Sequence, residues 1–264
     1  MKFENKKIAV IGGGSIGTAM AKGLLKGNAV NAEDLIITRK KEDLPKDNRE
    51  MYFQEDNSDA VRKSEIIIYA VRPGQFADVL KETKKDLDPE KHIIVSVVSG
   101  FTAKDIEDII GTEFNVIRAM PNTAIAIGES MTCIAGDSAD KSALEYVKEL
   151  FNHAGLCLII EERQMLSATA LCSCGVAFFL RSVRAASQGG IQSGFHSQEA
   201  LIMAAQTAKG AAELILENGS HPESEIDKVT TPRGCTIAGL NEMEFQGFSS
   251  AMIKGILAAQ KVSH

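Results

Sequence analysis

Residues 230–244, TTPRGCTIAGLNEME, place several hydroxyls and backbone N–H groups at the start of an expected helix. Two threonines, a proline and a glycine precede the helical pattern, and Arg233 falls in the turn. The first N–H groups of a helix have no partner within the helix, and the helix dipole favours negative charge there. The segment therefore predicts a binding site for an anionic group.

A second segment, residues 7–25, has the sequence KIAVIGGGSIGTAMAKGLL and the pattern of a strand, a turn and a helix. Its glycines at 12, 14 and 17 have G-x-G-x-x-G spacing, which in this context favours dinucleotide binding over a merely structural glycine turn. The first glycine permits the tight turn, the second lets a pyrophosphate approach, and the third allows close helix–strand packing. The expected cofactor-binding residues of this loop are Ile11, Gly12, Gly13, Gly14, Ser15, Ile16 and Gly17.

The end of the expected second strand bears on which dinucleotide binds. The strand 35–38 ends in Thr38 and is followed by Arg39, Lys40 and Lys41. A hydroxyl followed by cations suits a 2′-phosphate, so NADPH is expected to be preferred, with NADH also possible. Asp34 precedes the strand and would point away from the ribose. A solvated basic loop is the alternative interpretation.

Two further loops follow expected strands, at the sheet edge where open α/β sheets bind ligands. The first is YAVRPGQ, residues 69–75, which could line the cofactor cleft. The second is RAMPNTAIAIGES, residues 118–130, in which Asn122 and Thr123 offer polar groups to a nicotinamide or a substrate. Either loop could instead be an ordinary proline turn.

The elements that must position these residues change character near residue 162. Before it, short apolar runs alternate with amphipathic stretches, which is typical of a mainly parallel sheet covered on both faces. The expected strands are 7–11, 35–38, 66–71, 92–98, 115–118, 131–135 and 156–160. After it, apolar residues recur at helical spacing, as in residues 197–218, and an alanine-rich stripe indicates packing against a second subunit.

We therefore expect an α/β protein with two domains. Residues 1–161 would form an N-terminal, doubly wound, mainly parallel dinucleotide-binding domain. Residues 162–264 would form an all-α C-terminal domain for substrate binding and dimerisation.

Composition excludes several classes of function. The net charge of −6 over 264 residues argues against nucleic acid as a partner. Apolar runs such as residues 65–71 are too short to cross a membrane, and the first residues do not resemble a signal peptide, so a cytoplasmic location is expected. The five cysteines are expected to be buried, reduced thiols. The Cys172-Ser-Cys174 spacing does not suit a zinc site, so no metal is expected.

Several segments together resemble pyrroline-5-carboxylate reductase almost from end to end. They are the glycine loop, AVRP at 70–73, MPNTAIAIGE at 120–129, the stretch 204–240 and GFSSAMIKGI at 247–256. The resemblance implies a Rossmann-like domain and a helical domain that interleaves with its partner in a homodimer, sometimes assembled further into a decamer. It also implies the last step of proline biosynthesis, in which NADPH reduces the cyclic imine 1-pyrroline-5-carboxylate to L-proline.

The resemblance assigns roles residue by residue. The loop before the helix at 235 would hold the substrate carboxylate through Thr231, Gly234, Cys235 and Thr236, and Thr236 would also orient the ring nitrogen as the catalytic residue. Asn122 is a further substrate-binding candidate. The cofactor-binding candidates outside the glycine loop are Thr38, Arg39, Asn57, Val71, Arg72 and Pro73.

The mechanism that the resemblance implies needs no strong protein acid. The candidate pocket contains no histidine, and a cyclic imine can be protonated from solvent near neutral pH. The enzyme would then orient the iminium against the reduced nicotinamide, and positioning of this kind lowers a barrier substantially.

The sequence departs from the family pattern at three places. The usual Gly-Ser-Gly-Pro-Ala-Tyr is replaced by residues 172–178, the usual Ser-Pro-Gly-Gly by 231–234, and the usual Asn-Thr-Pro by 122–124. Arg233 could point outward, clamp the carboxylate or block the pocket. The alternatives are a related imine or keto-acid reductase, or a non-catalytic NADP(H)-binding regulatory paralogue.

Overall fold

The computed structural model describes residues 6–40 and 51–262. By their internal contacts the residues form two compact units. One comprises residues 1–173 with 260–264, and the other comprises residues 174–259. The expected class, a mainly parallel α/β unit followed by a helical unit, is confirmed. The domain boundary at 161/162 stays a prediction, since the division by contacts falls between Ser173 and Cys174.

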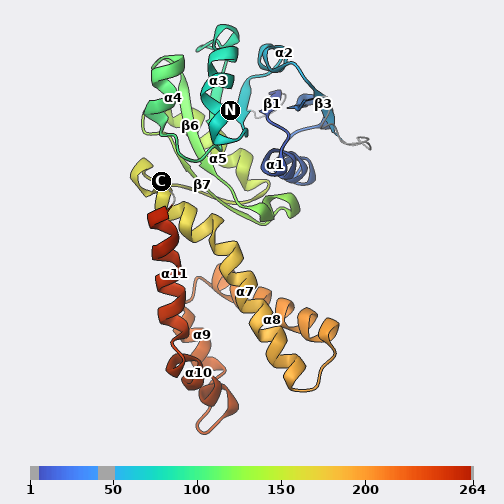
Figure 1. Cartoon of the computed structure of the whole chain (residues 1–264), viewed down its shortest axis with the longest axis vertical. Helices are drawn as coiled ribbons and strands as arrows, with labels where there is room; N and C mark the ends of the chain where they lie inside the picture. Colours follow the sequence, from blue (N-terminus) through green and yellow to red (C-terminus); the bar gives the residue numbers. More distant parts are fainter. Residues whose placement is uncertain (1–5, 41–50, 263–264) are drawn as a thin grey trace. The chain divides into compact units, whose positions relative to one another are not determined.

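Within the described residues, eight strands form one sheet in the order β3-β2-β1-β4-β5-β6-β7-β8 (Figure 1). All neighbouring pairs are parallel except β6 and β7, which are antiparallel. The strands are β1 (Ile8–Ile11), β2 (Leu35–Thr38), β3 (Tyr52–Gln54), β4 (Ile66–Tyr69), β5 (Ile93–Ser96), β6 (Asn115–Met120), β7 (Ser130–Ala135) and β8 (Gly155–Ile159).

The seven strands expected from apolar runs are all present, and β3 is the strand that those runs did not predict. Its three residues, Tyr-Phe-Gln, are half-buried or exposed. A short edge strand buries little, so it needs no apolar run and leaves a weak pattern in the sequence.

The N-terminal unit also contains helices on both faces of the sheet. Its α-helices are α1 (Ser15–Lys26), α2 (Asn57–Arg62), α3 (Pro73–Thr83), α4 (Ala103–Ile110), α5 (Lys141–Asn152) and α6 (Met165–Ala168). Its short helices are the 3-10 turns η1 (Ala32–Asp34), η3 (Lys84–Asp86), η4 (Thr123–Ile127) and η5 (Glu162–Gln164), and the π-helix η6 (Thr169–Ser173).

Successive strand residues point to opposite faces, so each face of the sheet has its own core. On one face, Ile8 and Ile66 cluster with buried residues of α1 and α5. On the other, Ala9 and Ile67 cluster with buried residues of α2, α3 and α4. The central strands β1, β4 and β5 are mainly apolar because both of their sides are buried.

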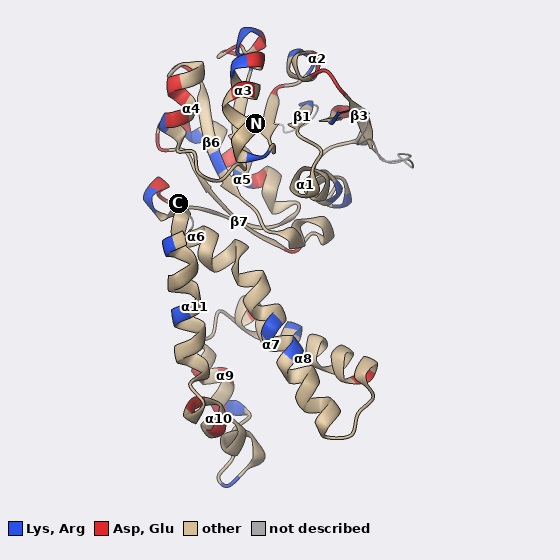
Figure 2. Cartoon of the chain, viewed as in Figure 1, with Lys and Arg blue, Asp and Glu red and all other residues tan. Residues whose placement is uncertain are grey.

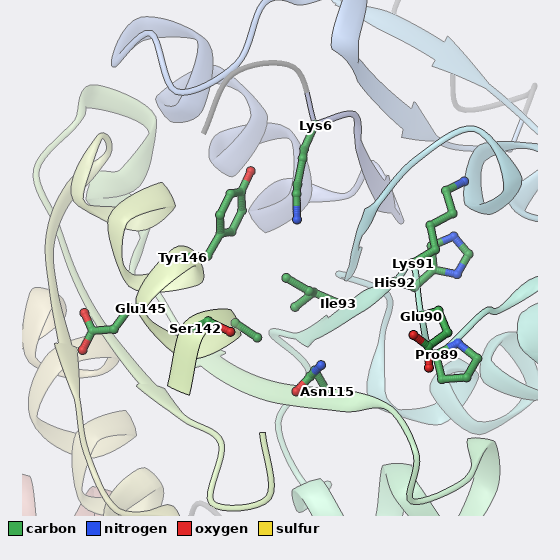
Figure 3. A pocket seen from close by; sticks show the side chains of 11 residues that line it. Lys6, Pro89, Glu90, Lys91, His92, Ile93, Asn115, Ser142, Glu145 and Tyr146 are labelled. Atoms are coloured by element: carbon green, nitrogen blue, oxygen red, sulfur yellow. The ribbon is translucent and has the colours of Figure 1, made fainter. Parts of the chain in front are cut away.

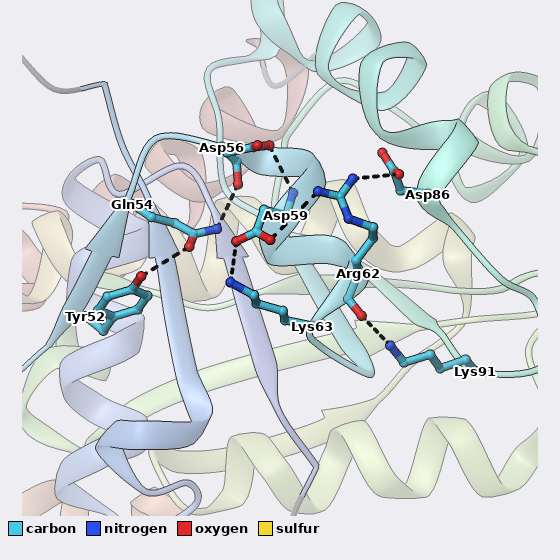
Figure 4. Close-up of polar contacts among 8 residues, drawn as sticks. All are labelled: Tyr52, Gln54, Asp56, Asp59, Arg62, Lys63, Asp86 and Lys91. Atoms are coloured by element: carbon cyan, nitrogen blue, oxygen red, sulfur yellow. Dashed lines mark hydrogen bonds and ion pairs between the residues drawn. The ribbon is translucent and has the colours of Figure 1, made fainter.

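A network of polar contacts holds α2 beside the carboxyl end of β3 (Figure 4). The Asp56 side chain accepts the N–H of Asp59 at 2.9 Å and so caps the helix. Arg62 pairs with Asp86 at 3.0 Å, and Lys63 pairs with Asp59 at 2.6 Å, lowering the pKa of that carboxyl. These contacts position Asn57, the first residue of α2 and a cofactor-binding candidate.

Residues 174–259, the second unit, contain helices joined by turns and no strand, as expected. Its elements are α7 (Gly175–Gln192), α8 (Ser197–Asn218), α9 (Pro222–Lys228), α10 (Cys235–Phe245) and α11 (Phe248–Val262), the last of which ends in the first unit. The helix predicted from apolar spacing over residues 197–218 is α8, with the same bounds.

Candidate functional site

The glycine loop joins β1 to α1 at the carboxyl edge of the sheet. Gly12 has φ +110°, and a Cβ there would lie 2.8 Å from the carbonyl oxygen of Ala70. A Cβ on Gly17 would collide with the carbonyl oxygen of Gly12, so the helix packs on the loop only with glycine there. A Cβ on Gly14 would meet nothing, and Gly14 caps α1 without a side-chain hydrogen bond. The loop therefore presents open space and uncapped N–H groups where a pyrophosphate would approach.

Thr38 anchors this loop from the end of β2. Its hydroxyl accepts the N–H of Gly12 at 3.1 Å, and its carbonyl oxygen accepts the N–H of Gly13 at 2.6 Å. The Thr38 side chain is buried. The threonine thus positions the glycines through its oxygen. Accepting this bond does not use its O–H donor, so its expected contact with a 2′-phosphate stays a prediction.

A hollow of about 430 Å³ brings most of the cofactor-binding candidates together. It is lined from the glycine loop, the end of β2, the start of α2 and the loop between β4 and α3. The expected residues among its lining are Gly12, Gly13, Gly14, Thr38, Arg39, Asn57, Val71 and Arg72. Lys40 of the basic run and Ala70 and Gln75 of the YAVRPGQ loop also line it, as the sequence indicated, whereas sequence reasoning did not single out Glu55 and Val79.

The remaining cofactor-binding candidates lie around this hollow rather than in its lining. Ile11 is buried in β1, Gly17 is buried in the first turn of α1, and Ile16 packs against the core. Pro73 is the exposed first residue of α3. Ser15, the fifth remaining candidate, lines a neighbouring hollow.

Arg39 is shared with a neighbouring hollow of about 350 Å³ along α1. Ser15, Thr18 and Lys22 line that hollow from one face of the helix. Lys22 therefore adds a cation to the hollow that Arg39 lines, and sequence reasoning missed it. Ser15, Thr18 and Lys22 follow one another at intervals of three and four residues, so they share one face of the helix. This pattern could have indicated Lys22. Lys41, expected to continue the basic run, lies outside the described residues.

Asn122 lies in the loop after β6, and its side chain makes two hydrogen bonds within the protein. Its Oδ1 accepts the N–H of Ala124 at 3.0 Å, and its Nδ2 donates to the carbonyl oxygen of Cys172 at 3.2 Å. The residue is 7% exposed. Asn122 thus ties η4 to the π-helix η6, and its contact with a substrate stays a prediction.

The N-terminus of α10, where the sequence predicts an anion site, lies in the helical unit. Gly234 caps the helix without a side-chain hydrogen bond, and its first turn contains no acidic residue. A Cβ on Gly234 would collide with Oγ1 of Thr231, so glycine lets the threonine lie against the cap. Thr236 is half-buried in the first turn of α10, and Cys235 is exposed. Cys235 thus differs from the expectation that the cysteines are all buried.

Arg233 occupies a strained position in the turn before this helix. The N–H of Gly234 donates to the carbonyl oxygen of Thr231 at 2.9 Å, closing a turn with Pro232 and Arg233 at its centre. Arg233 has φ +60°, the left-handed conformation that type II turns reserve for glycine. Its side chain is exposed. The departure from the family's usual glycine therefore places a cation beside the start of α10 at a conformational cost.

We expect Arg233→Gly to be more stable than Arg233→Ala by about 1 kcal/mol, because a left-handed conformation costs a residue with a Cβ about 1–2 kcal/mol. Both variants remove the same charge, so the alanine variant is the matched control. Thermal unfolding of the two variants checks this result. Equal midpoints would show that the turn carries no strain.

Another hollow, of about 390 Å³, opens at the amino ends of β5 and β6 (Figure 3). Lys6 and Tyr146 face one another across it, with the ammonium 4.8 Å from the ring centroid. Ile93 and Asn115, which begin the two strands, form part of its lining. This hollow is at the sheet edge opposite to the one where open α/β sheets bind ligands.

Two protein-family models match this chain, one in its N-terminal part and one in its C-terminal part. A family model described as pyrroline-5-carboxylate reductase dimerisation matches residues 162–264, and one described as NADP oxidoreductase, coenzyme F420-dependent, matches residues 7–100. Pyrroline-5-carboxylate reductase 2 of Dictyostelium discoideum is 45% identical over 98% of this chain and 93% of its own length. The chain belongs to the pyrroline-5-carboxylate reductase family.

Two further relatives support membership of the pyrroline-5-carboxylate reductase family. Pyrroline-5-carboxylate reductase 1 of Dictyostelium discoideum is 46% identical over 98% of this chain, which spans 49% of that relative's length. A crystal structure of Plasmodium falciparum pyrroline carboxylate reductase with NADP bound has a TM-score of 0.87 and 26% identity, covering 98% of this chain and 97% of that one. The resemblance inferred from the sequence motifs is confirmed.

The helical unit of this pyrroline-5-carboxylate reductase family member has a strongly apolar surface. Charged residues are sparse along α7, α8 and α11 (Figure 2). Leu180, Leu216 and Phe245 are 62%, 67% and 83% exposed. A hollow of about 1060 Å³ lies along α7, α8 and α10, with Phe179 and Met203 in its lining. Exposed apolar area on this scale marks an interaction surface, and the dimerisation model supports oligomer formation.

One helical run, Glu162–Gln192, is long and apolar enough by length and composition to cross a membrane. The sequence analysis expected no segment long enough to cross a membrane, because the uninterrupted apolar runs are short. In this helical run the apolar residues are instead spread along the helix among a few polar ones. The same run begins the segment that matches the dimerisation model. An apolar face that packs on another subunit has the same composition.

Proposed function

We propose that this chain is a pyrroline-5-carboxylate reductase, which uses NADPH to reduce the cyclic imine 1-pyrroline-5-carboxylate to L-proline, the last step of proline biosynthesis. The observation that carries the proposal is that the chain contains both a hollow around the glycine loop and an uncapped helix start beside Thr231 and Thr236. Membership of the pyrroline-5-carboxylate reductase family supports the substrate assignment.

The glycine loop suits NADP(H). The open space at Gly14 and the uncapped start of α1 accommodate a pyrophosphate, while Arg39 and Lys40 in the same hollow suit a 2′-phosphate. Thr38 holds the loop in the conformation that leaves this space open. When bound, NADPH supplies the hydride from its reduced nicotinamide.

The start of α10 would hold the substrate carboxylate. The N–H groups of Cys235 and Thr236 and the hydroxyl of Thr231 are the donors, with Gly234 allowing the close approach. The helix dipole and the absence of acidic residues in the first turn favour the anion. Thr236 orients the ring nitrogen by a hydrogen bond, and we infer that the iminium proton comes from solvent.

Thr236→Val is expected to lower kcat/KM for the imine by about 10–100-fold, since a lost hydrogen bond to a charged group costs roughly 1.5–3 kcal/mol. Thr236→Ser keeps the hydroxyl and is the matched control, which should stay within a few-fold of the wild type. Steady-state oxidation of NADPH measures both. A valine variant with unchanged kcat/KM would remove Thr236 from the catalytic role.

Arg39→Ala is expected to raise KM for NADPH by about 10–100-fold while leaving KM for NADH almost unchanged. The reason is that only NADPH carries the 2′-phosphate, to which a guanidinium makes charge-assisted hydrogen bonds. NADH is therefore the internal control. If KM for both cofactors rose together, Arg39 would serve the shared part of the dinucleotide instead.

The domain and assembly assignments extend this proposal. Residues 1–161 would bind the dinucleotide, and residues 162–264 would bind substrate and form a homodimer through the apolar faces of α7, α8 and α10. We propose that the run Glu162–Gln192 packs in this dimer and does not cross a membrane. The five free thiols, Cys133, Cys157, Cys172, Cys174 and Cys235, suit a reducing compartment and support a cytoplasmic location.

A further inference from the structure

Two hollows adjoin at the glycine loop. The larger hollow, of about 430 Å³, is the one lined by most of the cofactor-binding candidates, and the smaller hollow, of about 350 Å³, follows α1. Gly14 and Arg39 line both of them, so the two spaces meet at these residues. A ligand bound at the glycine loop can therefore extend from the larger hollow into the smaller one.

Hydrogen bonds through the glycine loop connect the two segments that line the smaller hollow. The Thr18 hydroxyl donates to the carbonyl oxygen of Gly13 at 3.1 Å, and the N–H of Gly13 donates to the carbonyl oxygen of Thr38 at 2.6 Å. Arg39 follows Thr38 directly in the chain. Lys22 lies four residues after Thr18, on the same face of α1 and about 6 Å further along the helix axis. The glycine loop thus holds the backbones that carry Lys22 and Arg39 in a fixed relation.

The two hollows differ in charge. Among the described residues that line the smaller hollow, Lys22 and Arg39 are the cations and none is acidic. The larger hollow has Arg39 and Lys40, but Glu55 also lines it. A phosphate monoester carries about two negative charges near neutral pH, so a space lined by cations without a carboxylate favours it. The smaller hollow therefore suits the 2′-phosphate better than the larger one does.

We propose that Lys22 binds the 2′-phosphate of NADPH together with Arg39, where the two hollows meet. Arg39 is half-buried and presents a rigid planar group, whereas Lys22 is exposed and carries its charge on a flexible stem. Lys22 is thus a second residue that makes the chain prefer NADPH to NADH. The inference rests on the proposed function, in which the glycine loop binds NADP(H), and adds to it a specificity residue from α1.

Equilibrium binding of the reduced dinucleotides tests Lys22 without any turnover. NADPH and NADH differ only in the 2′-phosphate, and the fluorescence of their nicotinamide reports binding to the full-length protein. Lys22→Met keeps the apolar stem and removes the charge. It is expected to raise Kd for NADPH by about tenfold, as for the loss of one hydrogen bond to a charged group, and Kd for NADH by less than about twofold.

Lys26→Met is the matched control for Lys22→Met. Lys26 lies one turn further along α1, lines neither hollow, and donates from its ammonium to the carbonyl oxygen of Ile127 at 2.6 Å. The substitution removes the same charge from the same helix. It should leave Kd for both dinucleotides within about twofold of the wild type, because screening weakens the attraction between distant exposed charges.

Two further measurements separate phosphate binding from an effect on the helix. Lys22→Arg keeps the cation and should hold Kd for NADPH within about threefold of the wild type. Added sodium chloride should weaken NADPH binding more steeply in the wild type than in Lys22→Met, because salt screens the contact of an exposed ammonium with a phosphate. The salt dependence of NADH binding should be the same in both proteins.

The outcomes distinguish this role from its alternatives. An unchanged Kd for NADPH in Lys22→Met would overturn the proposal. Equal losses for the two dinucleotides would also overturn it, since the ammonium would then serve the shared pyrophosphate. A wild type that binds both dinucleotides equally well, or binds neither, would overturn it too. If the wild type binds NADPH but does not reduce 1-pyrroline-5-carboxylate, the proposed function fails, while the Kd values still decide the role of Lys22.

Discussion

Gly17→Ala is expected to abolish measurable NADPH binding and to lower the thermal midpoint by about 6–12 °C. A Cβ at this position collides with the carbonyl oxygen of Gly12, which is backbone and cannot move without displacing the loop. Overpacking of this kind costs about 3 kcal/mol, and in a chain of this size each kcal/mol shifts the midpoint by about 2–4 °C. The displaced loop also loses the two hydrogen bonds to Thr38. Calorimetry and fluorescence titration with NADPH measure the two effects.

Gly14→Ala is the matched control for Gly17→Ala, because a Cβ on Gly14 meets no atom of the protein. Its thermal midpoint should stay within about 2 °C of the wild type. Its affinity for NADPH should fall by tenfold or more, since the added methyl group occupies the space needed by the pyrophosphate. A Gly14→Ala protein that binds NADPH normally would show that the phosphates lie elsewhere.

Glu162→Ala is expected to destabilise the protein by about 3 kcal/mol, one of the larger effects available in the described structure. Arg118 is 8% exposed and pairs with Glu162 at 2.7 Å, and the same carboxylate accepts the N–H of Ala103 at 3.2 Å. Removing the carboxylate leaves a guanidinium buried without its partner, which is costlier than losing the pair itself. Urea unfolding measures the change in free energy.

The neighbouring residue supplies the control for this pair. Glu161 pairs with Arg163 on the surface, where the two side chains are 60% and 80% exposed. Glu161→Gln should change stability by less than about 0.5 kcal/mol, because exposed ion pairs are screened by solvent. If the two variants lowered the free energy of unfolding by similar amounts, the large effect of Glu162→Ala could not be explained by the burial of Arg118.

The fold was largely predictable because most of its strands are buried on both sides. Apolar runs mark such strands clearly, whereas the edge strand Tyr52–Gln54 has no such run. The glycine loop was equally predictable, since the backbone geometry that the spacing encodes requires glycine at 12 and 17, while Gly14 leaves open space.

The rest of the site depends on contacts between distant residues, which spacing does not encode. The sequence showed a hydroxyl at Thr38 but not the Gly12 N–H that it accepts. It showed a polar amide at Asn122 but not the carbonyl of Cys172 that this amide binds. The left-handed backbone of Arg233 was hidden for a different reason, because arginine rarely adopts that conformation and so gives no signal for it.

The central claim is tested most directly by adding 1-pyrroline-5-carboxylate to the purified protein and NADPH, while following NADPH absorbance and the formation of proline. NADH in a parallel reaction reports the cofactor preference. We expect one proline for each NADPH oxidised, in a protein-dependent reaction, with a lower kcat/KM for NADH. Binding of NADPH without oxidation of either cofactor would contradict the reductase assignment and point to a non-catalytic dinucleotide-binding protein.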